Sequence, residues 1–284
     1  MPELPEVELV VRSLNAIVSG KKIATSELLR ERLAPDCSPA DFANRVSNCK
    51  INFVYRRGKQ ILFDLDNGQT LVTHLRMSGR FMHLPFECEN PKFAHAIFYL
   101  DGDTRLVFED QRHFGLMKIV ETSQVNEMES ISKLAPEPFS SEFSAEYLRV
   151  QLRSSKRSLK EFLIDQTKVN GLGNIYAAEV MFLAKLNPQQ AANTVSAPKS
   201  VILHGKIREV LDEAVALGAT LEIDKTNIGG SIYGSGAESV WRVYDREGKA
   251  CFVCELPIQR IRQGGRSTYF CKRCQRKPAV KRSK

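Results

Sequence analysis

Four cysteines near the C-terminus constrain the fold of this chain more than any other feature. Cys251, Cys254, Cys271 and Cys274 form the pattern C-x2-C-x16-C-x2-C, which is typical of zinc sites. Each C-x2-C pair supplies two thiolates from one turn, and four thiolates complete a tetrahedron around the metal. Because no coordination position stays open, the pattern predicts one structural Zn²⁺ ion. Two disulfides are the alternative, although a reducing compartment disfavours them.

The excess positive charge of the chain lies in the same region. Of the 41 Lys and Arg residues, 13 fall within the last 44 residues, against only 3 of the 33 Asp and Glu residues. A basic surplus confined to one end indicates a polyanionic partner, most commonly a nucleic acid. We interpret residues 278–284 as a solubilising basic tail. The basic residues before the tail alternate with structure-forming ones, so we assign the binding to them.

The composition is that of a globular protein, with 43% hydrophobic and 26% charged residues. A length of 284 residues predicts two domains, or one large domain with attachments. No apolar run reaches membrane-spanning length, and acids stand at the N-terminus where a signal peptide has bases. We therefore expect a cytoplasmic protein that does not associate with membranes.

The hydrophobic pattern predicts two kinds of structure. Apolar residues at helical spacing from Val7 to Val18 predict a first helix that ends near Gly20. Many short antiparallel strands beside one helix favour a two-layer β-sandwich packed by that helix, and helices follow, so the fold class is α+β. The predicted strands lie at 51–55, 60–65, 70–75, 94–100, 104–108 and 116–120. The later helices are predicted at 143–152, 158–165, 175–186 and 200–217.

These patterns divide the chain into three parts and a tail. We expect a β-sandwich domain at 1–130, a helical domain at 131–240 and a zinc-held hairpin at 241–277, with Gly264-Gly265 at its tip. The turn at 167–174 leads into a helix. Backbone amides that are unpaired in such a turn and at the start of the helix are suited to binding a phosphate group. A plain connection between helices is the alternative for that turn. Residues from about 218 to 239 are expected to form a mobile loop.

The first residues combine a nucleophile with two acids. We expect removal of Met1, because the next residue is as small as Pro2, and this leaves a secondary α-amine. An α-amine has a pKa of about 7.7–8.0, so it can attack the masked aldehyde of a sugar, as a lysine does in forming a Schiff base. Glu3 and Glu6 lie within one helical turn and could move the protons. A plain helix start is the alternative, since Pro5 and acidic residues favour one.

Three motifs together resemble the bacterial formamidopyrimidine-DNA glycosylase family: Pro2–Glu8, the turn Gly171–Tyr176 and the cysteine quartet. The resemblance covers essentially the whole chain. It implies an N-terminal antiparallel β-sandwich with a flanking helix, a helix–two-turns–helix domain with a lesion-capping loop, and a β-hairpin zinc finger. The implied enzyme is a monomeric DNA glycosylase and abasic-site lyase of base excision repair in the bacterial cytoplasm and nucleoid. Its implied partner is double-stranded DNA containing oxidised purines (8-oxoguanine and formamidopyrimidines) or abasic sites, which it cuts by β,δ-elimination.

The same resemblance implies the catalytic roles. Pro2 matches the nucleophile that attacks the sugar C1′, and Glu3 matches the acid that protonates the ring oxygen. Glu6 matches a second carboxylate of the pocket, and Lys59 matches a lysine beside the nucleophile. The chemistry agrees, because a nearby ammonium group keeps an amine unprotonated. A solvated charge before a strand is the alternative for Lys59.

The resemblance also implies the DNA contacts. A base that is to be excised must leave the stack, and apolar wedges can hold the deformed duplex. Met77 matches the inserted residue, Arg112 the residue that faces the orphaned cytosine, and Phe114 the wedge at the neighbouring step. Without the family, Met77 and Phe114 would be interpreted as core residues. The residues implied to contact phosphates are His74, Lys59, Asn174 and Arg266, and Lys160 matches a lysine near the lesion pocket.

Two departures from the family pattern concern the DNA contacts. Gln111–Phe114 stands where the family commonly has Pro-Arg-Arg-Phe, so His113 replaces an arginine, and the loop at 218–239 follows the family poorly. An endonuclease VIII-type glycosylase for oxidised pyrimidines is the nearest alternative, although that branch usually has glycine where this chain has Leu4. A non-catalytic zinc-finger DNA-binding protein is the other alternative, and the intact catalytic residues argue against it.

Overall fold

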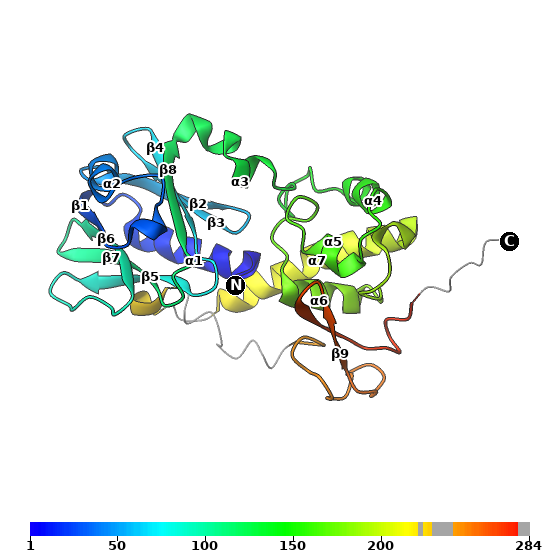
Figure 1. Ribbon diagram of the computed structural model, residues 1–284. Helices are drawn as coiled ribbons and strands as arrows, with labels where there is room; N and C mark the ends of the chain where they lie inside the picture. The colour runs from blue at the N-terminus through cyan, green and yellow to red at the C-terminus, as the bar shows by residue number, and fades with distance from the viewer. Residues whose placement is uncertain (221–223, 229–240, 278–284) are drawn as a thin grey trace. The chain divides into compact units, whose positions relative to one another are not determined.

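The computed structural model describes residues 1–220, 224–228 and 241–277. These residues form two compact units, each of which is described by itself. The first consists of Met1–Ser132 and the described part of Val215–Ser235, and the second of Lys133–Ala214 and the described part of Gly236–Lys284 (Figure 1). The basic tail expected at 278–284, and most of the loop expected at 218–239, lie outside the described residues.

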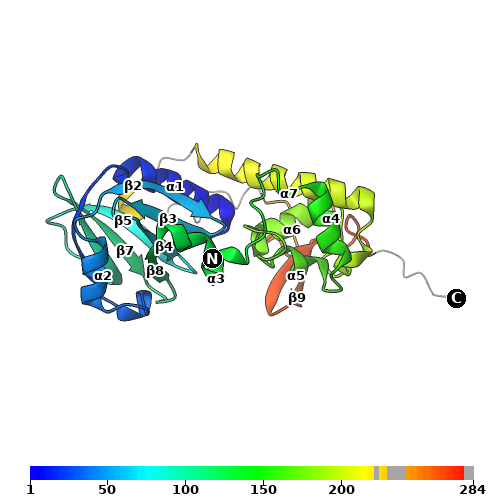
Figure 2. The same ribbon diagram turned by 90° about the horizontal axis from the view of Figure 1, so that it is seen from above.

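A helix opens the first unit and supplies much of its core. α1 (Leu4–Val18) begins after Glu3, whose backbone amide donates to the Glu6 carboxylate at 2.7 Å. This is the reciprocal pairing by which a glutamate one turn into a helix stabilises its start. The predicted helix is confirmed, and Figure 2 shows it alongside β2 (Ile51–Arg57). Its buried face includes Val7, Val10, Val11, Leu14 and Val18.

Two four-stranded antiparallel sheets form a sandwich, as predicted. Their orders are β2-β3-β4-β8 and β1-β6-β7-β5, and apolar side chains from both sheets and α1 make one core. Phe63 of the first sheet packs on Phe81 of the second with ring centroids 5.5 Å apart, and Phe81 packs on Phe108 at 5.2 Å. Besides β2, the strands are β1 (Ile23–Leu28), β3 (Gln60–Leu65), β4 (Gln69–His74), β5 (Gly79–Pro85), β6 (Ala94–Leu100), β7 (Thr104–Asp110) and β8 (Leu116–Glu121).

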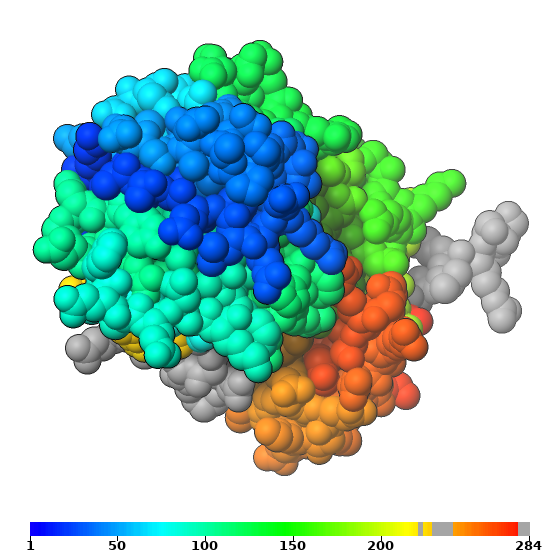
Figure 3. Space-filling model, turned by 60° about the vertical axis from the view of Figure 1, so that its left-hand side comes forward, coloured from blue at the N-terminus to red at the C-terminus, as the bar shows by residue number. Residues whose placement is uncertain are grey.

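Among the strands and α-helices of this unit, β1, β5, α2 (Pro39–Val46) and α3 (Glu129–Ser132) do not appear in the sequence-based prediction. The two strands are fixed by partners distant in sequence, since β1 pairs with β6 and β5 with β7. Figure 3 shows the blue N-terminal residues directly against cyan-green ones on one face of this unit. Such pairing is tertiary, so local alternation of apolar residues predicts these strands poorly.

The segment after the last helix attaches to an edge of the sandwich. The backbone amide of Phe81 donates to the carbonyl of Ile228 at 3.1 Å, and the Ile228 side chain is fully buried. Beside it, Arg80 Nη1 donates to Asn227 Oδ1 at 2.7 Å. The chain is therefore anchored at residue 228, immediately before residues outside the described part.

The second unit is mainly helical. Ser144 and Ser158 cap two of its helices, because their hydroxyl groups accept hydrogen bonds from backbone amides three residues on, at 3.0 and 3.4 Å. The helices are α4 (Ala145–Arg153), α5 (Leu159–Leu163), α6 (Asn174–Leu183) and α7 (Ala197–Gly218), the last containing the boundary between the units. The chain also forms α3 (Glu129–Ser132) and the 3-10 helices η1 (Glu31–Leu33), η2 (Thr122–Glu127), η3 (Ala192–Thr194) and η4 (Lys225–Asn227).

A single carboxylate attaches the C-terminal segment to α6. Glu179 is 2% exposed and accepts hydrogen bonds from the backbone amides of Arg242, Val243 and Tyr244, at 2.8, 2.9 and 2.9 Å. Three donors to one buried carboxylate compensate for its removal from water. The chain is therefore held firmly where it enters the cysteine-containing segment.

A two-stranded ribbon completes the second unit. β9 (Gln259–Gln263) and β10 (Arg266–Phe270) are antiparallel, and the turn between them is Gly264-Gly265, with φ values of 55° and 75°. Two successive positive φ angles are what a tight hairpin turn requires, and glycine adopts them freely. The predicted hairpin, its tip and the α+β class are confirmed. Among the described residues, no helix has both the length and the apolar character needed to cross a membrane.

Candidate active site, nucleic-acid interface and metal centre

The start of the chain lies in a charged environment in the first unit. Pro2 and Glu3 are buried, whereas Met1 is 46% exposed. Lys59, in the turn between β2 and β3, is 6% exposed. Burial lowers the pKa of the α-amino group at the chain start, as do the charges of Lys59 and Arg112, while Glu3 and Glu6 raise it; the net effect is a lower pKa. The structure thus brings the N-terminus and the three predicted ionisable catalytic groups together.

His74 at the end of β4 is a neutral hydrogen-bond donor. Burial, followed by the charges of Arg76 and Lys59, lowers its pKa to about 3. The backbone amide of Arg76 donates to Nδ1 at 3.0 Å, so the ring proton is on Nε2. This side chain can donate one hydrogen bond to a phosphate oxygen, but it contributes no charge at neutral pH.

Met77, predicted to be inserted into the duplex, and its predicted partners Arg112 and Phe114 lie on two exposed loops of the first unit. Met77 and Phe114 are 44% and 45% exposed, although large apolar side chains are usually buried. Arg112 is exposed and its guanidinium lies 5.2 Å from the centroid of the Phe114 ring. Both loops meet at the carboxylate of Asp110. Sequence reasoning missed Asp110, although an acid between a strand and a turn that ends in Gly115 was a signal.

In the second unit, Asn174 and Lys160 occupy different environments. Asn174 is the first residue of α6, where backbone amides and the helix dipole favour an anion. Its buried Oδ1 accepts no hydrogen bond from any described residue. Lys160 is 1% exposed and donates from Nζ to the carbonyl of Ser267 in β10 at 3.0 Å. Burial, followed by the charge of Arg266, lowers the pKa of Lys160 to about 8.

Arg266 is exposed at the first position of β10, directly after the glycine turn. The register Arg266↔Gln263 and Thr268↔Ile261 places these residues on one face of the ribbon, because alternate residues of a strand share a face. On the opposite face, Arg260 Nε donates to Ser267 Oγ at 3.0 Å. The ribbon therefore presents arginines on both faces, and Arg266 lies apart from Arg260 and Arg262.

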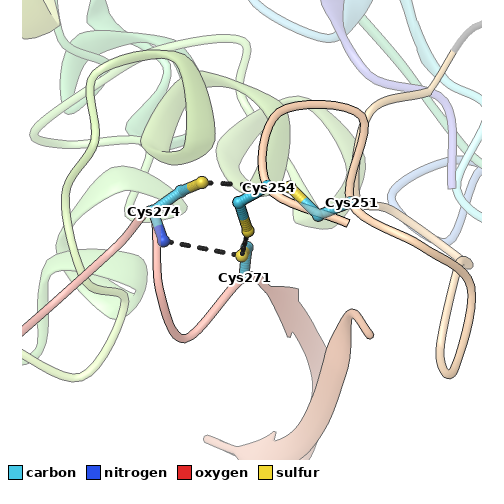
Figure 4. A group of neighbouring side chains, drawn as sticks. All are labelled: Cys251, Cys254, Cys271 and Cys274. Carbon is cyan, nitrogen blue, oxygen red and sulfur yellow. Dashed lines mark hydrogen bonds between the residues drawn. The ribbon is translucent and has the colours of Figure 1, made fainter. Parts of the chain in front are cut away.

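The four cysteines converge to form a metal centre (Figure 4). Their Sγ atoms all lie within 4.8 Å of one another; Cys251 and Cys274 are 3.9 Å apart, and Cys254 and Cys271 are 3.4 Å apart. A tetrahedron with Zn–S bonds of about 2.3 Å has sulfur atoms roughly 3.8 Å apart. These separations fit zinc and far exceed a disulfide bond of about 2.05 Å. The residues are thus suited to one structural zinc ion, which closes the base of the ribbon.

Comparisons with known proteins cover nearly the whole chain. Models of the formamidopyrimidine-DNA glycosylase N-terminal domain, of its H2TH domain and of the zinc finger found in FPG and IleRS match residues 1–117, 134–225 and 248–276. The formamidopyrimidine-DNA glycosylases of Pediococcus pentosaceus and Desulforamulus reducens are 39% and 37% identical to it, and each match covers 97% of this chain and 99% of the relative.

Solved structures agree with these matches. Lactococcus lactis Fpg (MutM), in a complex with DNA containing N7-benzyl-Fapy-dG, is 33% identical with a TM-score of 0.89. A complex of the same protein with DNA containing an abasic site is 32% identical, also with a TM-score of 0.89. Both matches cover 97% of this chain and 100% of the solved chain. The chain therefore belongs to the formamidopyrimidine-DNA glycosylase family.

Proposed function

We propose that this protein is a bifunctional DNA glycosylase and abasic-site lyase that excises oxidised purines, 8-oxoguanine and formamidopyrimidines, from double-stranded DNA. The observation that carries the proposal is the environment of the chain start, where Pro2, Glu3 and Lys59 are buried and the pKa of the terminal amine of Met1 is lowered. A nucleophilic amine must be unprotonated, and burial beside a cation favours that state. Relatives crystallised with Fapy-dG-type and abasic-site DNA add support.

The proposed chemistry begins with removal of Met1, which makes the Pro2 nitrogen the terminal amine. Its lone pair attacks C1′ of the damaged nucleotide, and the base leaves with the electron pair of the glycosidic bond and takes up the proton that the Pro2 nitrogen loses. Glu3 protonates the ring oxygen, so the sugar opens and Pro2 forms an iminium ion with C1′. Loss of the C2′ proton then expels the 3′ phosphate, a second elimination expels the 5′ phosphate, and water releases Pro2.

The proposed DNA contacts follow from exposure and charge. Met77 and Phe114 would enter the stack where the base has left, because they are apolar and exposed. Arg112 would face the orphaned base. His74, Lys59, Asn174 and Arg266 would contact phosphates, which position the protein without selecting a base. For Lys160, burial under the ribbon favours support of the Arg266 strand, in addition to the position near the lesion pocket that the resemblance implies.

Reduction by borohydride in the presence of abasic duplex DNA tests the proposal, because it converts the iminium ion to a stable covalent complex. We expect a cross-link at Pro2 with processed protein, and none with protein that retains Met1. Glu3→Gln should slow excision of 8-oxoguanine opposite cytosine. Glu8→Gln is the matched control, at a glutamate inside the helix that Glu3 precedes, where Glu8 pairs with Arg56 at 2.7 Å. Full activity of protein that retains Met1 would refute the mechanism.

A second candidate substrate is an oxidised pyrimidine. Lactococcus lactis Fpg, 33% identical, was also crystallised with DNA containing an oxidised pyrimidine. Single-turnover excision of 8-oxoguanine and of thymine glycol, each in the same duplex, separates the two candidates. We expect the purine to react faster, and the opposite order would favour an endonuclease VIII-type activity. A protein that binds both duplexes without cutting either would be the non-catalytic alternative.

We further propose that the protein acts as a monomer in the bacterial cytoplasm, where its DNA substrate lies. We assign catalysis to the domain at 1–130, DNA binding to the domain at 131–240 and support of Arg266 to the zinc finger at 241–277. Sedimentation with and without a lesion-containing duplex tests the first point. We expect one protein chain per duplex, and a dimer at nanomolar concentration would contradict it.

A further inference from the structure

Asp110 occupies a junction between the two loops that bear the exposed apolar residues. It is the last residue of β7, it pairs with Gly79 at the start of β5, and it is fully buried. One loop, with Met77, precedes Gly79, and the other, with Phe114, follows Asp110. A buried carboxylate at this place needs hydrogen-bond donors to compensate for its desolvation.

Four donors, drawn from both loops, meet the Asp110 carboxylate. Oδ1 accepts from the hydroxyl of Ser78 and from the backbone amide of Arg112, the latter at 3.2 Å. Oδ2 accepts from the amides of Phe114 and Gly115, each at 2.7 Å. Ser78 Oγ also accepts from the Arg112 amide at 3.1 Å, which joins the loops directly. Burial raises the pKa of Asp110, but these hydrogen bonds outweigh it and leave the pKa lower than usual.

The backbone around this carboxylate is packed too closely for other side chains. A Cβ atom at Gly79 would lie 2.5 Å from the carbonyl oxygen of Leu75 and 2.7 Å from the Phe108 ring. At Gly115 it would lie 2.8 Å from the same ring. Both loops therefore leave the sheet at positions fixed by a shared aromatic ring and a shared carboxylate, and neither can shift alone without breaking hydrogen bonds of the other.

We propose that Asp110 is a positioning residue that fixes the Met77 loop and the Arg112–Phe114 loop in one geometry, so that both enter the duplex as a unit when the damaged base leaves the stack. This inference rests on the proposed function, but its structural part does not depend on catalysis. Displacement of a reacting or inserting group by about 1 Å can cost roughly a hundredfold in rate. A buried residue that touches no DNA can therefore control excision.

The test uses Asp110→Asn in the full-length zinc-bound protein. The amide side chain keeps the shape but cannot accept from all four donors, because its nitrogen donates. Asp103→Asn is the matched control: Asp103 is exposed at the far turn of β6 and β7, with a φ of 54° that asparagine tolerates. Ser78→Ala removes only the hydroxyl bridge and serves as a milder second variant.

Single-turnover excision is compared on 8-oxoguanine paired in a duplex and on the same base in an unpaired bulge. Unstacking costs least when the base is already unpaired. We expect Asp110→Asn to slow excision from the paired duplex by about tenfold or more, with a much smaller loss on the bulge. Ser78→Ala should show a weaker version of this pattern, and Asp103→Asn none. Equal losses on both substrates, or no loss on either, would overturn the inference.

Amide hydrogen exchange without DNA separates this inference from the proposed function. Asp110→Asn should speed exchange at Phe114 and Gly115, and leave the strands of the sheet β2-β3-β4-β8 unchanged. Unchanged exchange at both amides would refute the positioning role of Asp110 even if the wild-type enzyme is active. Conversely, a wild-type protein that excises neither substrate would refute the proposed function. Faster exchange in Asp110→Asn would still support the positioning role of Asp110.

Discussion

Replacing Arg266 by glutamine should reduce the salt dependence of DNA binding by one phosphate contact. The guanidinium is exposed directly after the hairpin turn, and its strand is supported from below by the buried Lys160. For B-DNA, each neutralised phosphate contributes about −0.9 to the slope of log K against log salt. If one contact is lost, the ratio of the wild-type to the variant binding constant should therefore fall by about 3.5-fold between 50 and 200 mM salt.

Fluorescence anisotropy with a labelled abasic-analogue duplex measures this slope over that salt range. Arg262→Gln is the matched control, because it makes the same exchange at an exposed position on the opposite face of the ribbon. We expect the control to keep the wild-type slope. An unchanged slope in Arg266→Gln would remove this residue from the phosphate contacts, and a reduced slope in Arg262→Gln alone would show that the other face binds DNA. Zinc content and melting temperature, measured in parallel, establish that both variants are folded.

Three further predictions concern single groups. His74→Ala should weaken DNA binding without changing the salt slope, because the pKa of about 3 leaves the ring neutral; a changed slope in the same anisotropy titration would contradict this. Lys160→Met should remove a pH dependence of stability. The pKa of Lys160 is lowered to about 8 in the folded protein, so above pH 8 the unfolded chain binds more protons than the folded one. In urea titrations, the free energy of unfolding of the wild type relative to that of the variant should therefore rise by roughly 2 kcal/mol from pH 8 to pH 10. Chelation of zinc, or Cys271→Ala, should abolish DNA binding and speed amide exchange in β9 and β10 while sparing α1; retained binding after complete zinc loss, measured by atomic absorption, would refute a structural role.

The elements that the sequence predicted are ones whose determining signal was local, although α2, with its Ser38 cap, was missed. The cysteine spacing identified the metal centre, the periodicity from Val7 to Val18 identified α1, and the pair Gly264-Gly265 identified the hairpin tip. Edge strands such as β1 and β5 escaped prediction because their identity depends on partners far along the chain.

The candidate site shows the same limit. The residues that carry the resemblance could be named from sequence, and the structure places those of the first unit around the N-terminus and on two adjoining loops. The lowered pKa values of His74 and Lys160 could not be predicted from residue type, because both arise from burial by parts of the chain that are distant in sequence. Asp110 was missed for another reason: its importance comes from hydrogen-bond donors on two loops, which the acid between a strand and a turn signals only weakly.

The chain is held at two points that flank residues 229–240. On one side, Ile228 is hydrogen-bonded to Phe81 and buried, and on the other, Glu179 holds the three amides from Arg242 to Tyr244. Residue 228 and residues 242–244 are therefore each fixed within their own unit, so a segment exchanged between them would begin and end at the same backbone positions.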